Sequence, residues 1–172
     1  NNLENKKNKL YQILIFLCSI LYLALLIKII ILKNGAIYHN NINLQLFSFL
    51  REYQHLGLTF NLIVNVIGNI VLFIPLSIIL KYYFSFLSNG HIIFIGTCTS
   101  LSFELIQLAT RWGIFDINDI ILNAIGCIIG ILIYIVIKKL KSSNLVTTLF
   151  LSSFTTMSIL SVYTYYPRFI MM

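Results

Sequence analysis

Long apolar runs separated by short polar stretches dominate this chain. A helix needs about 20 mainly apolar residues to cross a bilayer. Five runs meet this requirement, at residues 10–32, 59–80, 91–110, 119–137 and 145–163, and the last of them is rich in Ser and Thr. The pattern predicts an all-α, polytopic membrane helical bundle of about five transmembrane helices, forming a single domain over residues 1–172.

The composition agrees with this pattern and excludes several classes of protein. Hydrophobic residues make up 59% of the chain and charged residues only 10%, whereas soluble domains carry about 25% charged residues. The mean hydropathy is +0.91, and a chain of 172 residues cannot bury so much apolar surface in one aqueous core. A soluble enzyme, a secreted disulfide scaffold and a disordered tail are therefore excluded. We expect a multi-pass protein of the cell membrane, with bilayer lipid as its surroundings.

The basic residues predict the orientation of the chain. They flank the apolar runs instead of gathering on one soluble face, so we expect no binding to nucleic acid. With a cytoplasmic N-terminus, seven would lie inside (Lys6, Lys7, Lys9, Lys81, Lys138, Lys139, Lys141) and four outside (Lys33, Arg51, Arg111, Arg168). Because cytoplasmic loops retain Lys and Arg, this count favours a cytoplasmic N-terminus. Residues 33–58 and the loop around Asp116 would then face outward, with a short interfacial helix over residues 42–55.

Polar and small residues inside the apolar runs form one stripe on each of three predicted helices. At 100° per residue, the members of each stripe fall within about 100° of one another. The stripes are Asn61, Asn65, Gly68 and Asn69 in the first, Ser100, Glu104, Gln107 and Arg111 in the second, and Asp119, Asn123, Gly126 and Gly130 in the third. Amide and small residues often join membrane helices. We expect this of Asn61 and Ser100, and we expect Gly126 and Gly130 to permit close helix approach.

Glu104 is interpreted differently. Burying a carboxyl group about 10 Å below the end of a span costs free energy, and such a group usually marks a functional site. All three stripes should meet in the outer half of the bilayer, below the loop that carries Asp116 and Asp119. The predicted site therefore has Glu104, Asp116 and Asp119 at its centre, with Arg111 as the counter-charge. Its supporting residues are Gln107, Asn65, Asn69 and Asn123. Nothing in the spacing of the His and Cys residues indicates a metal site, and no cofactor is identified.

Five linked elements resemble the VanZ-like family. They are Asn65-x-x-Gly68-Asn69, Phe73-Ile74-Pro75, Ser100-x-x-x-Glu104-x-x-Gln107, Phe115-Asp116-Ile117-x-Asp119 and Asn123-x-x-Gly126. Together they cover about residues 40–137, although Arg111 is shifted from the family's basic position before Phe-Asp. The resemblance implies a bacterial cytoplasmic-membrane protein, linked through the family's namesake to resistance against the glycopeptide teicoplanin.

Three classes of function remain open. The first is an outward-facing acidic site that binds an envelope lipid or the antibiotic through fixed carboxylate charges. The second is an intramembrane enzyme acting on an envelope lipid or lipid-linked precursor, with paired carboxylates or a hard divalent cation. No nucleophile–base pair can be identified from the spacing. The third is a structural or assembly protein in which the stripes join helices.

Overall fold

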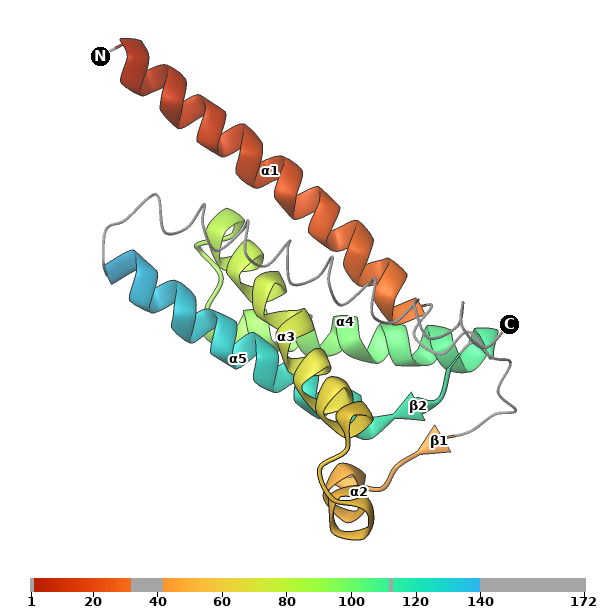
Figure 1. Ribbon diagram of the computed structural model, residues 1–172. Coiled ribbons are helices and arrows are strands. Elements are labelled where there is room, and N and C mark those ends of the chain that lie inside the picture. Colours follow the sequence, from red (N-terminus) through yellow and green to blue (C-terminus); the bar gives the residue numbers. More distant parts are fainter. Residues whose placement is uncertain (1, 32–41, 112, 140–172) are drawn as a thin grey trace. The chain divides into compact units, whose positions relative to one another are not determined.

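The computed structural model describes residues 2–31, 42–111 and 113–139, and these residues are mainly helical (Figure 1). The chain divides into two compact units. One consists of Asn1–Ile29 with Ile135–Met172, and the other of Ile30–Tyr134. The first unit contains helix α1 (Asn2–Ile31) except for its last two residues. The second contains every residue predicted for the site.

Four helices in the described ranges are long and apolar enough to cross a membrane. Besides α1, they are α3 (Phe60–Tyr83), α4 (Asn89–Thr110) and α5 (Ile117–Lys139). The prediction of a helical membrane bundle is confirmed, and α3, α4 and α5 each begin and end within three residues of the predicted runs. The fifth predicted span, residues 145–163, lies outside the described residues. Large apolar side chains remain exposed, such as Phe94 at 69% and Leu132 at 57%, as expected of surfaces that meet lipid.

Hydroxyl side chains fix where α3 and α4 begin. Thr59 Oγ1 accepts the backbone N–H of Leu62 at 3.2 Å, and Ser88 Oγ accepts that of His91 at 3.3 Å. These caps satisfy donors that the first turn of a helix leaves unpaired. Helix α4 ends at Thr110, because the left-handed backbone conformation of the next residue, Arg111 (φ 58°), stops the helical path.

Glycines bring α5 against α3. A Cβ atom at Gly126 would overlap the carbonyl oxygen of Ile70, and one at Gly130 would overlap the Ser77 hydroxyl and the carbonyl oxygen of Ile74. The absence of a side chain therefore allows α5 to rest directly on the α3 backbone. This confirms the close helix approach predicted for these two glycines.

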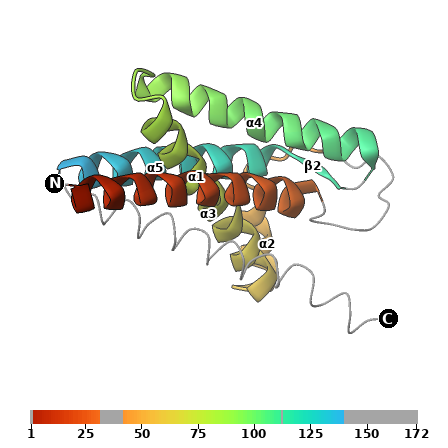
Figure 2. The ribbon, with the colours of Figure 1, turned by 90° about the horizontal axis from the view of Figure 1, so that it is seen from above.

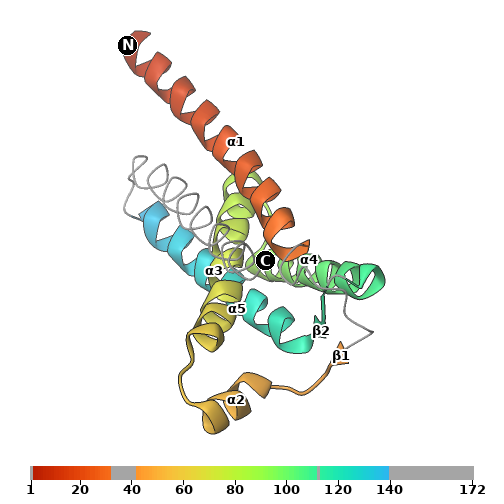
Figure 3. The same ribbon diagram turned by 45° about the vertical axis from the view of Figure 1, so that its right-hand side comes forward.

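A short parallel strand pair links two loops of the second unit. Strand β1 (Ile42–Asn43) pairs with β2 (Phe115–Asp116), with Ile42 opposite Phe115 and Asn43 opposite Asp116. The two strands lie side by side in Figures 1 and 3, and Figure 2 shows β2 leading from the end of α4 toward α5. Helices α3 and α4 separate β1 from β2 in sequence, so the two segments meet at one end of these helices.

The predicted helix over residues 42–55 is wrong in its first part. The helix, α2, covers Ser48–Leu56 only. Residues 42–43 pair with β2 instead, and Phe47 has a left-handed backbone (φ 56°) that a right-handed helix cannot contain. Apolar periodicity extended the prediction too far, because it does not detect backbone pairing with a distant segment.

Candidate functional site

The site is built around Asp116, which lies where β2 passes into α5. Oδ2 of Asp116 accepts a hydrogen bond from Asn43 Nδ2 at 2.9 Å, so side chains reinforce the backbone pairing of β1 with β2. Oδ1 of Asp116 accepts the backbone N–H of Asn118 at 2.8 Å. This second bond is that of an N-cap residue, and a negative charge at a helix N-terminus is also favoured by the helix dipole. Asp116 is therefore held in a fixed position.

Asn118 ties the two loops together and is only 3% exposed. Its Oδ1 atom accepts the backbone N–H of Phe47 at 2.6 Å. Its Nδ2 atom lies 2.9 Å from the Gln45 carbonyl oxygen, 2.9 Å from Ser48 Oγ and 2.8 Å from Asp116 Oδ1. One buried amide thus sets the path of residues 45–48, including the uncommon backbone of Phe47 before α2 begins.

Glu104 lies behind Asp116. Its Oε2 atom accepts the backbone N–H of Asp116 at 2.8 Å, and the side chain is only 2% exposed. Gln107 is equally buried, and a Cβ atom at Gly113 would come within 2.7 Å of its Oε1 atom. The predicted α4 stripe therefore supports the turn that leads into β2. Glu104 acts as a positioning residue for Asp116.

Two further polar pairs join the helices below the strands. Asn69 on α3 donates to Oδ1 of Asp119 on α5, and Asn123 on α5 donates to Ser100 Oγ on α4 at 2.7 Å. All four side chains are buried. Asn123 Oδ1 is buried with no hydrogen-bond partner among the described residues. These pairs connect α5 to both neighbouring helices in the way expected of polar groups inside membrane bundles.

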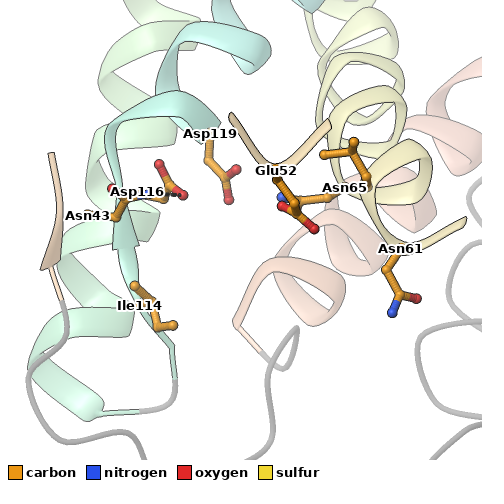
Figure 4. Close-up of a pocket in the computed structure, with 8 residues that line it drawn as sticks. Asn43, Glu52, Asn61, Asn65, Ile114, Asp116 and Asp119 are labelled. Atoms are coloured by element: carbon orange, nitrogen blue, oxygen red, sulfur yellow. Dashed lines mark hydrogen bonds between the residues drawn. The ribbon is translucent and has the colours of Figure 1, made fainter. Parts of the chain in front are cut away.

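A cavity of about 370 Å³ opens beside Asp116 and Asp119 (Figure 4). Strand and α5 residues form one wall, and residues of α2 and α3 face them. The lining residues are Asn43, Glu52, Asn61, Leu62, Asn65, Ile114, Asp116 and Asp119. Three are carboxylates and three are amides, and none of these eight described residues is basic. The cavity is therefore an acidic pocket of mainly polar surface, and we call it the acidic cavity.

The three carboxylates of the acidic cavity differ in how they are held. Asp116 accepts bonds from Asn43 and Asn118, and Asp119 accepts one from Asn69. The exposed side chain of Glu52 has no hydrogen-bond or ion-pair partner in the described part of the chain. Glu52 is thus free to turn toward a ligand without losing a structural contact.

The structure places the predicted site residues in three groups. Asp116, Asp119 and Asn65 line the acidic cavity. Behind this wall lie Asn69 and Glu104, each hydrogen-bonded to one of the aspartates, together with buried Gln107 and Asn123. Arg111 is exposed at the end of α4 and is not among the lining residues. The expected counter-charge is not at the cavity, because the helix ends before Arg111 and its helical angle no longer applies.

Sequence reasoning missed Asn43, Glu52 and Asn118 as parts of the site. Asn118 lies between the two aspartates of the motif but off the helical stripe. Glu52 lies on the polar face of the amphipathic segment, which was interpreted only as a membrane-surface helix. In the described ranges no three His, Cys, Asp or Glu side chains lie close enough together to hold a metal ion.

Comparison with known proteins gives the family. No curated protein and no solved structure matches the chain. The model of the VanZ/LLP1 family matches residues 16–138, which contain α3, α4, α5, both strands and the whole acidic cavity. This match covers well over half of the 172 residues. The chain therefore belongs to the VanZ/LLP1 family of membrane-embedded proteins.

Proposed function

We propose that this protein binds the cationic group of an envelope lipid or of a glycopeptide antibiotic such as teicoplanin in the acidic cavity. The observation that carries the proposal is that three of the eight lining residues are carboxylates and none of the eight is basic. Such a lining attracts a protonated amine, and carboxylates form strong charge-assisted hydrogen bonds with one. The three lining amides add neutral donors and acceptors for the rest of a polar headgroup.

The way the carboxylates are held favours binding over catalysis. Asp116 caps α5 and accepts bonds from Asn43 and Asn118, so its position is fixed. Fixed charges suit recognition of a cation. No Ser–His or Cys–His pair lines the cavity, whose residues are only acidic, amide or aliphatic. An intramembrane enzyme therefore remains the second candidate.

The proposal includes the orientation of the cavity. The excess of basic residues on one side of the predicted spans favours a cytoplasmic N-terminus. With α1 and α3 as spans on either side of β1, the acidic cavity would then face outward, toward the surface on which cell-wall antibiotics act. We place the protein in a bacterial cytoplasmic membrane, where this orientation would expose the cavity to ligands at the outer surface.

Direct binding tests the proposal. The full chain in phosphatidylcholine nanodiscs would be titrated with two amphiphiles that each carry a protonated amine, teicoplanin and lysyl-phosphatidylglycerol. We expect saturable binding of at least one, weakened about tenfold by Glu52→Gln and reduced by added salt, because exposed charge pairs are screened. Glu52→Asp, the matched control, keeps the negative charge at the same position and should bind nearly as well as the native chain. Binding that is identical in all three proteins would overturn the proposal.

Antibiotic protection is tested separately in a teicoplanin-sensitive Gram-positive host. Cells expressing the native chain should tolerate more teicoplanin than cells expressing Glu52→Gln at the same membrane level, measured by immunoblot. If the native chain gives no protection while lysyl-phosphatidylglycerol binds in vitro, the ligand is an envelope lipid and the antibiotic is excluded.

A further inference from the structure

A second, apolar depression adjoins the acidic cavity. It has a volume of about 220 Å³ and lies between α2 and the first half of α3. Its lining is entirely apolar or aromatic: Phe49, Leu50, Tyr53, Leu58, Leu62, Ile63, Val66 and Ile67. We call this depression the apolar groove. Because α3 is long and apolar enough to cross the membrane, a groove along it would be accessible to lipid tails.

Leu62 connects the two depressions, since it lines both the acidic cavity and the apolar groove. Helix α2 also contributes side chains to both depressions, from its two sides. Glu52 faces the acidic cavity, whereas the next residue, Tyr53, lines the groove. Polar and apolar binding surfaces thus meet along one helix edge, which matches the junction between the headgroup and the tails of a lipid.

We infer that the acidic cavity and the apolar groove form one site for a membrane lipid whose headgroup carries a protonated amine. The amine lies among Glu52, Asp116 and Asp119, and one acyl chain lies in the groove along α3. This inference rests on the proposed function of the cavity. Charge complementarity selects the amine headgroup, because the carboxylates of Glu52, Asp116 and Asp119 would repel an anionic headgroup. The apolar lining selects the chain, since burying methylene groups there removes no polar contact.

The experiment uses photo-crosslinking lipids. The full chain would be placed in phosphatidylcholine nanodiscs containing a few per cent of lysyl-phosphatidylglycerol with a diazirine on its acyl chain. A parallel sample would contain phosphatidylglycerol with the same labelled chain and no amine. After irradiation and digestion, mass spectrometry locates the crosslinks. We expect the lysyl lipid to label residues 49–67 at least fivefold more than phosphatidylglycerol does. Equal labelling by the two lipids would overturn the inference.

Matched variants separate the two parts of the site. Ile67→Trp fills part of the groove, whereas Ile128→Trp makes the same change at an exposed position of α5 that lines neither depression. We expect Ile67→Trp to cut labelling of residues 49–67 several-fold, and Ile128→Trp to leave it unchanged.

The same labelling experiment distinguishes failure of this inference from failure of the proposed function. If Glu52→Gln lowers capture of the lysyl lipid but Ile67→Trp has no effect, the cavity binds amines and the groove assignment is wrong. If neither variant lowers capture, both the groove and the cation-binding cavity are rejected.

Discussion

The backbone N–H of Asp116 donates to Oε2 of Glu104 across a distance of 2.8 Å. The carboxyl group of Glu104, which is costly to bury inside α4, thus supports the segment that carries Asp116. Glu104 itself does not line the cavity. A buried acid in a membrane helix can serve function through geometry, by holding a charged neighbour where a ligand can reach it.

This bond predicts different outcomes for two substitutions of Glu104. Glu104→Ala leaves the Asp116 N–H without its acceptor, which should cost about 1–3 kcal/mol of unfolding free energy. Glu104→Gln keeps an oxygen at the same position and should lose clearly less. Thermal unfolding of the detergent-solubilised protein measures both changes, and equal losses for the two variants would contradict the positioning role.

Asn118 is expected to contribute strongly to the free energy of unfolding, although it lies outside the polar stripes predicted from the sequence. Asn118→Ala removes the acceptor of the Phe47 N–H and the donor to Ser48 and Asp116, so we expect a loss of about 2–3 kcal/mol. Hydrogen exchange at residues 43–48 should become faster. Asn89→Ala, at an exposed position of α4, is the control and should change neither quantity.

The glycines of α5 give a prediction about packing. Alanine at Gly126 or Gly130 would collide with α3, at the carbonyl oxygens of Ile70 and Ile74. We expect each substitution to cost about 1–3 kcal/mol, as overpacking does elsewhere. Gly90→Ala is the matched control, because its Cβ atom would meet only Ser88 Oγ at 3.8 Å. If all three variants unfold at the same temperature, the described α3–α5 contact is wrong.

Glu52 allows binding to be separated from stability. It lines the acidic cavity, but its side chain has no hydrogen-bond or ion-pair partner among the described residues. Glu52→Gln should therefore keep the unfolding free energy within about 0.5 kcal/mol while weakening capture of a cationic amphiphile. Asp116→Asn should lower both, since Asp116 also caps α5. A stability loss in Glu52→Gln equal to that of Asp116→Asn would show that Glu52 has a structural role.

Cysteine labelling tests the proposed orientation. The natural cysteines would first be replaced by alanine. Cysteine would then be introduced at Leu44, which is 66% exposed near β1, or at Phe86, which is 81% exposed in the turn between α3 and α4. A membrane-impermeant maleimide should label the Leu44 variant in intact cells and the Phe86 variant only after permeabilisation. The opposite result would place the acidic cavity on the cytoplasmic side.

Hydropathy was sufficient to locate the membrane helices, because a bilayer requires a long apolar run for each one. Helical periodicity also placed Glu104, Gln107 and Ser100 correctly on a buried face of α4. The same arithmetic failed one turn later, at Arg111. A left-handed backbone there ends the helix, and no periodic pattern shows such a change.

The rest of the site depends on contacts between distant segments. The bonds from Asn118 to Gln45 and Ser48 span 73 and 70 residues. Asn43 and Glu52 come from a segment whose relation to Asp116 is set by four residues of strand pairing. Such pairing is too short to produce an alternating pattern of its own. Asp116, Asp119 and Asn65 were therefore predictable as site residues from the sequence, whereas Asn43 and Glu52 were not.

The strand pair also has a consequence for the order in which the protein is made. Asn43 leaves the ribosome 73 residues before its partner Asp116, and both α3 and α4 are synthesised in the interval. Until then, the N–H and C=O groups of β1 must find other partners. The proposed ligand site can therefore form only after α4 and the start of α5, which carry or precede Asp116 and Asp119, have been synthesised.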